Sequence, residues 1–328
     1  MIARRTLILA LCAACLGVSF HSNAQQKIWR LGYLDYGSRE SAEISRRYAT
    51  FIEAMRGLGH VEGKDFVSEV RYAEGKSERL SPLAAELVQA KVDVILSGGT
   101  PATHALQRAT ATIPIVNTIV ADPVAEGFAM SLARPGKNIT GLASNNLEIV
   151  QKQVELLVKG SPRLQRVAVL SNPVNQGHPP MQKLIEEAAR RTGRRAIPTR
   201  AQSPEEIESA FASMAREHAE AVIILGDALF IQQGRQIAGL ARAQRMASIF
   251  TSPEYADAGG LMSYGPDILD HYRRAATFID KIFKGARPGD LPIEEPTLYF
   301  LVINRGTAKA IGLQLPQELL LRADRVIE

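Results

Sequence analysis

Val92-Asp93-Val94-Ile95-Leu96-Ser97-Gly98-Gly99 and Ala221-Val222-Ile223-Ile224-Leu225-Gly226-Asp227 are the two stretches that decide the fold of this chain. Each begins with a short apolar run rich in β-branched residues, which is typical of a strand covered by helices on both faces of a parallel sheet. A helical pattern and a second short strand, at residues 113–116 and 247–250, follow in each case. Residues 30–34 resemble residues 166–170 in the same way. The sequence therefore predicts two similar α/β halves.

The rest of the sequence continues this alternation of strands and helices. Strands are expected at residues 29–34, 66–72, 92–97, 113–119, 139–143, 166–171, 195–199, 221–225, 247–251 and 260–264. Helical patterns are expected at residues 41–58, 81–89, 146–158, 180–192 and 204–218. Strands that alternate with helices form βαβ units and parallel sheets. The predicted fold class is α/β, with two doubly wound parallel-sheet lobes joined by a multi-strand hinge.

We expect the first lobe to comprise residues 27–144 plus 266–290, and the second residues 145–265 plus 291–328, with a ligand cleft between them. The chain is expected to cross near residues 141–146 and to return near residues 265–266. Several crossings restrain two lobes to a hinge motion, which is how such lobes close around a ligand. A mature chain of roughly 300 residues is long enough for two domains of ordinary size.

The first 24 residues have the three-part layout of a secretory signal peptide. Arg4 and Arg5 form a basic start, residues 6–20 are uncharged and mostly apolar, and small residues precede the predicted cleavage after Ala24. The apolar run is about 15 residues, shorter than the roughly 20 of a spanning helix, so an uncleaved anchor is the weaker alternative. Lipid attachment at Cys15 is another alternative, although Cys12 stands where such sites usually carry leucine. We predict a soluble periplasmic protein.

Composition and missing motifs argue against several classes of function. Both cysteines lie in the leader, so the mature chain has no disulfide, thiolate metal site or cysteine nucleophile. The net charge of +5 comes from 39 basic residues scattered among 34 acidic ones, and no DNA-binding headpiece precedes the first strand, so no nucleic-acid partner is expected. Hydrolase, zinc-protease and dinucleotide motifs are absent, and surface or supporting roles are expected of the histidines. We predict a monomer without catalytic residue, cofactor or metal.

The first candidate for a ligand site is the loop that follows the strand at residues 92–97. Gly99 allows a ligand close access, Thr100 is expected to cap the next helix, and Pro101 and Ala102 are expected to begin it. The free N–H groups and the dipole at such a helix start favour a carboxylate. A helix start that is merely well capped is the alternative interpretation.

Other strand ends extend this candidate site, because ligands of open parallel sheets bind at the carboxyl edge of the strands. The residues concerned are Asp35, Tyr36, Asp122, Asn145, Asn172, Asp227 and Tyr264. The tyrosine rings are able to stack on a planar ligand. Tyr33 either joins them or points into the core, since side chains alternate along a strand.

Two blocks of sequence carry a family resemblance. Residues 92–143 contain Gly-Thr-Pro-Ala at 99–102, Ile-Pro-Ile-Val at 113–116, Asp-Pro-Val at 122–124, Leu-Ala-Arg-Pro-Gly at 132–136 and Asn-Ile-Thr-Gly-Leu at 138–142. The C-terminal part contains Ala-Gly-Gly-Leu-Met-Ser-Tyr-Gly-Pro at 258–266 and Leu-Leu-Leu-Arg-Ala-Asp at 319–324. These blocks resemble the ABC_sub_bind family of ABC transporter substrate-binding proteins. The resemblance implies a type I periplasmic-binding fold, a small-molecule ligand, which is tryptophan or tyrosine in some members, and an ABC permease as partner.

The resemblance leaves the identity of the ligand open. Family members commonly carry Ser-x-Gly after the first strand, where this chain has Asp35-Tyr36-Gly37. An amino group of the ligand could bind Asp35, Asp122 or Asp227, and the sequence does not choose among them. Delivery of an amino acid or an aromatic carboxylate to an importer is the leading hypothesis. A ligand-binding partner of a membrane sensor and a periplasmic enzyme on this scaffold are the alternatives.

Overall fold

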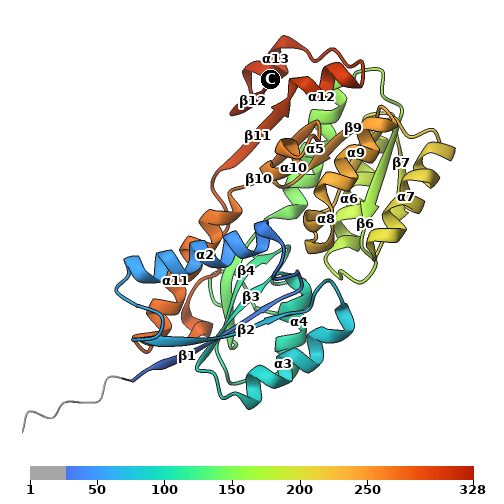
Figure 1. Cartoon of the computed structure of the whole chain (residues 1–328). Coiled ribbons are helices and arrows are strands. Elements are labelled where there is room, and N and C mark those ends of the chain that lie inside the picture. Colours follow the sequence, from blue (N-terminus) through green and yellow to red (C-terminus); the bar gives the residue numbers. More distant parts are fainter. Residues whose placement is uncertain (1–26) are drawn as a thin grey trace, which may run out of the picture.

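The computed structural model describes residues 27–328, which form two sheets with helices on both faces of each (Figure 1). The predicted signal peptide, residues 1–24, lies outside the described residues. The predicted α/β fold class with two doubly wound lobes is confirmed. The ten strands expected from the sequence are all present, with bounds shifted by at most two residues.

The first sheet has five parallel strands in the order β2-β1-β3-β4-β5. Side chains alternate along its strands, so Ile95 packs toward one pair of helices while Val94 and Leu96 pack toward the other pair. Its elements are β1 (Trp29–Asp35), α2 (Ala42–Gly57), β2 (Phe66–Tyr72), α3 (Leu80–Gln89), β3 (Val94–Gly98), α4 (Thr100–Ala109), β4 (Ile115–Val120), β5 (Ile139–Ala143) and, from later in the chain, α11 (Ile268–Phe283). Helices α3 and α4 cover one face, and α2 and α11 cover the other (Figure 1).

The second sheet has seven strands in the order β12-β11-β10-β9-β8-β6-β7. Its elements are α5 (Asn146–Gly160), β6 (Arg166–Ser171), α6 (His178–Arg191), β7 (Arg195–Arg200), α7 (Pro204–Arg216), β8 (Ala221–Ile224), α8 (Ala228–Gln232), α9 (Gly234–Ala243), β9 (Ala247–Phe250), α10 (Pro253–Asp257), β10 (Met262–Pro266), β11 (Tyr299–Asn304), α12 (Arg305–Ala310), α13 (Gln317–Leu321) and β12 (Arg325–Ile327). Helices α5 and α6 pack on one face, and α7 and α9 on the other.

Strands β11 and β12 were not expected from the sequence, and β11 runs antiparallel to β10. The direction has a simple cause. Strand β10 leaves the second lobe at Pro266, and β11 returns to it at Tyr299, the residue that pairs with Pro266. Two segments that leave and re-enter through the same passage must run in opposite directions. The second sheet is therefore mostly, but not wholly, parallel.

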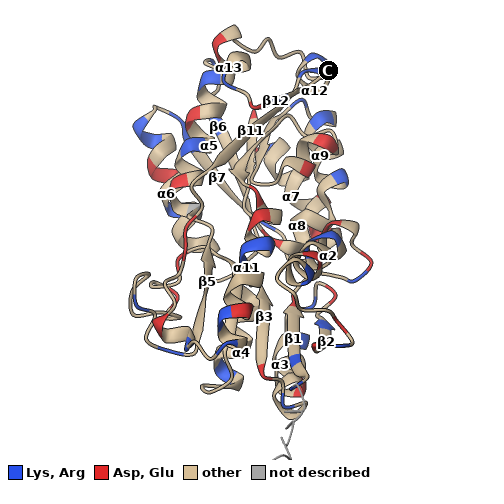
Figure 2. Ribbon diagram, turned by 90° about the vertical axis from the view of Figure 1, so that its left-hand side faces the viewer, with Lys and Arg blue, Asp and Glu red and all other residues tan. Residues whose placement is uncertain are grey.

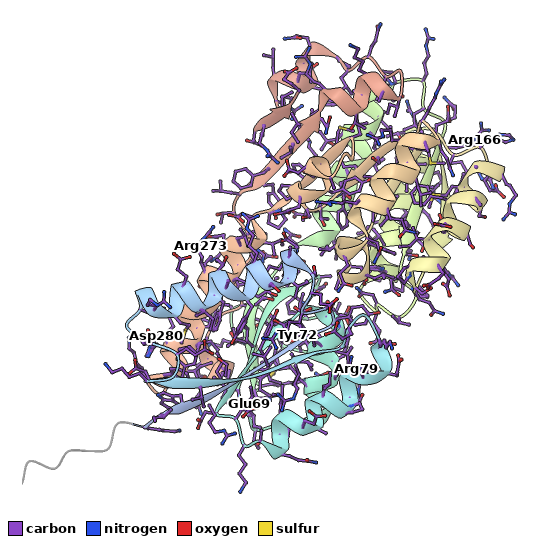
Figure 3. The ribbon with its side chains drawn as sticks, viewed as in Figure 1. Glu69, Tyr72, Arg79, Arg166, Arg273 and Asp280 are labelled. Carbon is purple, nitrogen blue, oxygen red and sulfur yellow. The ribbon has the colours of Figure 1, made fainter. Side chains whose placement is uncertain are left out.

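The chain passes between the two sheets after β5, after β10 and before β11. Helix α11 packs against α2 and β4, so it belongs with the first sheet. In Figure 3, Arg273 and Asp280 of α11 lie beside this sheet, whereas Arg166 lies far away in the other lobe. The Glu294 N–H donates to the Gly141 carbonyl (3.0 Å), so the segment after residue 290 still follows β5. The division into lobes stays a prediction, and this contact would move its last boundary beyond Glu294.

Candidate functional site

A cavity lies between the carboxyl ends of strands from the two sheets. The space not filled by atoms there is about 800 Å³, the part open to solvent included. The first lobe lines it with Asp35, Tyr36, Ile44, Arg47, Gly98, Gly99, Thr100, Pro101, Ile119, Ala121, Ser144 and Ile268. The second lobe lines it with Asn175, Met181, Gly226, Asp227, Ala228, Ile231, Thr251 and Ser252, and Pro266 lies at a passage between the lobes.

Helix α4 begins at the cavity wall, one residue earlier than expected. Gly99 is the N-cap, with φ of +107°, and Thr100 is the first helical residue, so the predicted capping role of Thr100 is wrong. No side chain caps the helix, because glycine takes this positive φ at little cost and occupies the cap position itself. The Thr103 hydroxyl holds the loop by donating to the Gly99 carbonyl (2.9 Å). The Thr100 side chain is 6% exposed and lines the cavity, whereas Ala102 faces the core.

Asp35 ends β1 with its carboxylate almost fully buried, at 2% exposure. One oxygen accepts from the Gly37 N–H (2.7 Å) and the other from the Tyr33 hydroxyl (2.7 Å). Tyr33 therefore points into the core, where its ring stacks on Tyr48. Burial raises the pKa of Asp35, although its hydrogen bonds and Arg47 oppose the rise. A Cβ atom built on Gly98 would overlap Oδ2 of Asp35 and lie 2.7 Å from its Cγ, so this position requires glycine.

Arg47 is the cavity residue that sequence reasoning missed most clearly. It lies on the buried face of α2 with Ile44 and Phe51, and it is 4% exposed. Its only hydrogen bond within the described chain runs from Nε to Glu43 (3.1 Å). Burial alone would lower the pKa of Arg47, but the nearby oxygens of Tyr272, Glu43 and Asp35 raise it. An arginine at a core-facing helix position was the available signal, because such residues are rarely buried without a partner.

Asp227 is the N-cap of α8 and the main charged group that the second lobe brings to the cavity. It is 5% exposed. Its Oδ1 accepts from the Leu229 N–H (2.9 Å) and from Asn172 Nδ2 (3.1 Å), and its Oδ2 accepts from Asn175 Nδ2 (2.8 Å). All these partners are neutral. Asn172 thus supports Asp227 from outside the cavity, while Asn175 lines it.

His178 locks the two loops that carry these residues. Its Nδ1 accepts from the Asn172 N–H (2.9 Å), which leaves Nε2 to donate to the Gly226 carbonyl (3.1 Å). The ring is buried and stacks on Phe230. Burial lowers the pKa of His178, in spite of Asp227 nearby, so the neutral form is favoured. This is the supporting role, rather than a surface position, that the sequence left open for the histidines.

Four of the predicted site residues lie outside the cavity, besides the supporting Asn172. Ala102 faces the core, and Asp122 caps its own loop by accepting from the Val124 and Ala125 N–H groups. Asn145 donates to Glu148, and Tyr264 stacks on Tyr299. Their strand-end positions are as expected, but their side chains turn to local partners.

The two lobes touch at the rim of the cavity. Arg46 Nη1 of α2 lies 3.7 Å from Glu254 Oε1 of α10. A Cβ atom on Gly177 would lie 3.5 Å from the Ala121 Cβ and 3.6 Å from Glu126 Oε1, both in the other lobe. The structure therefore has the lobes closed upon each other.

Comparison with known proteins identifies the family to which a chain with this cavity between two lobes belongs. The family model of ABC transporter substrate binding proteins matches residues 40–327. The chain belongs to this family. It is 23% identical over 275 residues to a tyrosine-binding protein of Clostridioides difficile, covering 84% of this chain and 79% of the relative. A conserved domain protein from Vibrio cholerae is 25% identical, with a TM-score of 0.85 over 92% of this chain and 100% of the other. A domain from Streptococcus pneumonia, solved in complex with L-Trp, is 22% identical, with the same TM-score and coverage.

The surface of this family member carries charges of both signs. Figure 2 shows Lys and Arg residues interspersed with Asp and Glu residues along the ribbon of both lobes. In residues 27–328, no helix is long and apolar enough to cross a membrane.

Proposed function

We propose that the mature protein lies in the periplasm, binds a small organic solute between its lobes and delivers it to the permease of an ABC importer without transforming it. The observation that carries the proposal is the cavity, which is lined by polar groups of both lobes. A solute held by both lobes favours the closed arrangement over the open one, because it makes its full set of contacts only there.

The solute we propose is an amino acid or a related carboxylate. Arg47 and the first N–H groups of α4 line the same cavity, and both favour an anionic group. A relative is a tyrosine-binding protein, and a similar solved structure holds L-Trp. The charge pattern and these relatives support the same class of ligand.

The first test is native mass spectrometry of gently purified protein, followed by calorimetry with the solute that is released. We expect a retained small molecule and a smaller radius of gyration in the bound than in the ligand-free protein. An unchanged mass of the solute after prolonged incubation would support binding without catalysis. Chemical conversion of the solute would contradict the proposal and favour the enzyme hypothesis.

A matched pair of variants tests the anion site. Arg47→Met removes the buried guanidinium, whereas Arg56→Met removes an exposed one from the same helix. We expect the first variant to weaken binding of a carboxylate roughly tenfold to a hundredfold, the usual effect of losing a charged hydrogen bond. The second variant should bind like wild type. Equal affinities in both variants would contradict an anion site at Arg47.

A further inference from the structure

Two carboxylates from opposite lobes line the cavity, and each accepts hydrogen bonds only from neutral groups. Asp35 accepts from a backbone N–H and a tyrosine hydroxyl. Asp227 accepts from a backbone N–H and two asparagine amides. No lysine, arginine or histidine of the described chain forms an ion pair with either one. A carboxylate offers about four acceptor positions, so each keeps at least one position for a further donor.

The positive charge that the cavity already contains does not balance the charges of these two carboxylates. Arg47 is the only cationic side chain among the residues that line the cavity in residues 27–328. Its Nε is engaged with Glu43, a third and largely buried carboxylate. Burying a charge without an opposite charge is unfavourable. Closure of the lobes thus places excess negative charge in an enclosed space, and a ligand with a positive group removes this penalty.

We infer that the ligand carries an ammonium group that binds between Asp35 of the first lobe and Asp227 of the second. This inference rests on the proposed solute-binding function and names the group through which the solute is recognised. A zwitterionic α-amino acid fits best, because Arg47 and the start of α4 remain available for its carboxylate. A simple amine fills only the ammonium position.

A purely structural role for the two aspartates is the competing explanation. Both accept N–H groups near a strand end, as does Asp122 outside the cavity. Asparagine accepts such bonds about as well as aspartate does, so capping alone does not require a charge. No group of three metal-ligating side chains occurs in the described residues, which favours an organic cation over a metal ion as the occupant.

The experiment compares compounds that differ only in the ammonium or carboxylate group. Leucine is compared with 3-methylbutylamine and 4-methylpentanoate, and tyrosine with tyramine and 3-(4-hydroxyphenyl)propanoate. The remaining amino acids are screened by thermal shift, and the bound compounds are measured by calorimetry. We expect loss of the ammonium to weaken binding at least about tenfold, as for loss of a charged hydrogen bond. Amines that lack the carboxylate should keep part of the affinity.

Variants then locate the ammonium site. Asp35→Asn and Asp227→Asn should each weaken binding of the best amino acid roughly tenfold to a hundredfold. Asp122→Asn is the matched control and should leave the affinity unchanged. Melting temperatures without ligand verify that all three variants fold. A second pair, Asp35→Ser and Asp227→Ser, provides smaller side chains should an asparagine variant fail to fold.

The inference is overturned if the acids bind as well as the amino acids, if both asparagine variants bind like wild type, or if no amine or amino acid binds. The proposed function fails separately. A neutral or anionic solute that binds and closes the lobes would contradict the ammonium site but preserve solute binding. A purified protein that retains no solute and closes upon none would contradict solute binding itself.

Discussion

The contact between Gly98 and Asp35 allows a sharp test of how the first half of the site is built. In Gly98→Ala, the new Cβ would overlap Oδ2 of Asp35 and lie 2.7 Å from its Cγ. The backbone at Gly98 is not in the left-handed region, so the substitution acts through the steric contact alone. The carboxylate must move away from its position between Tyr33 and Gly37.

The size of the effect follows from the contacts that are lost. Forcing an extra methyl group into a packed site costs about 1–3 kcal/mol. A hydrogen bond to a charged group contributes about 1.5–3 kcal/mol, and displacement of the carboxylate weakens at least one of two such bonds. We expect Gly98→Ala to lower the free energy of unfolding by about 2–4 kcal/mol, measured by denaturant titration of the ligand-free protein. Gly239→Ala, at a helix position with no atom within 4 Å of the new Cβ, is the control and should stabilise by about 0.5–1 kcal/mol.

A double-mutant cycle decides whether Asp35 is the cause. Asp35→Ser shortens the side chain at the position of the overlap, so Gly98→Ala should cost much less in that background. A coupling of at least about 1 kcal/mol between the two sites is the expected result. Equal costs of Gly98→Ala in both backgrounds would refute the reasoning, and so would a Gly98→Ala variant as stable as wild type.

Three further predictions follow from the same structure. The Thr100 hydroxyl caps no helix, so Thr100→Ala should leave the ligand-free melting temperature unchanged while lowering affinity about tenfold by calorimetry; a lower melting temperature with unchanged affinity would contradict a role in binding. Burial lowers the pKa of His178 below its ordinary value of 6.5. As pH falls below 6.5, the unfolded chain therefore binds a proton before the folded protein does. The stabilisation that is present above pH 6.5 is lost as the pH approaches the pKa of the folded protein. Denaturant titrations at pH 7.5 and 5 should show that the free energy of unfolding falls less between these pH values for His178→Gln than for the exposed control His218→Gln. Equal losses of free energy in the two variants would be evidence against a role of His178 in the pH dependence. Gly177 has φ in the ordinary negative range and lies at the rim opposite Glu126, so the side chain of Gly177→Leu should hold the lobes apart. Scattering of this variant with saturating ligand should give a larger radius of gyration than that of the wild type. An equal radius of gyration would contradict this prediction.

The strands were predictable because their physical cause is local. Strands β2, β5 and β6 have the predicted bounds, since each is an apolar or β-branched run between clear turn signals. Strand β11 was missed although Tyr299–Asn304 is also apolar, because it does not follow the repeated strand-helix pattern. Strand β12 has three residues and depends on its pairing with β11. A strand that exists through its partner has little sequence signal of its own.

The site was predictable only as far as topology determines it. The rule that ligands bind at the carboxyl edge led to Asp35, Thr100 and Asp227, all of which line the cavity. The same rule led to Asp122 and Asn145, whose side chains bind their own loops. Strand-end position fixes where a residue lies but not where its side chain turns. Arg47 lies on a helix rather than at a strand end, so the rule could not reach it.

The distribution of charge explains why each lobe carries one carboxylate of the proposed site. Asp35 and Asp227 belong to different lobes and are almost fully buried, at 2% and 5% exposure. Neutral hydrogen bonds from Tyr33, Asn172 and Asn175 compensate for only part of the hydration that these buried carboxylates lack. A ligand ammonium contacts both carboxylates only in the closed state, so its affinity for the closed state exceeds its affinity for the open one. This difference is the quantity that shifts a conformational equilibrium, and splitting the two charges between the lobes makes closure dependent on the ligand.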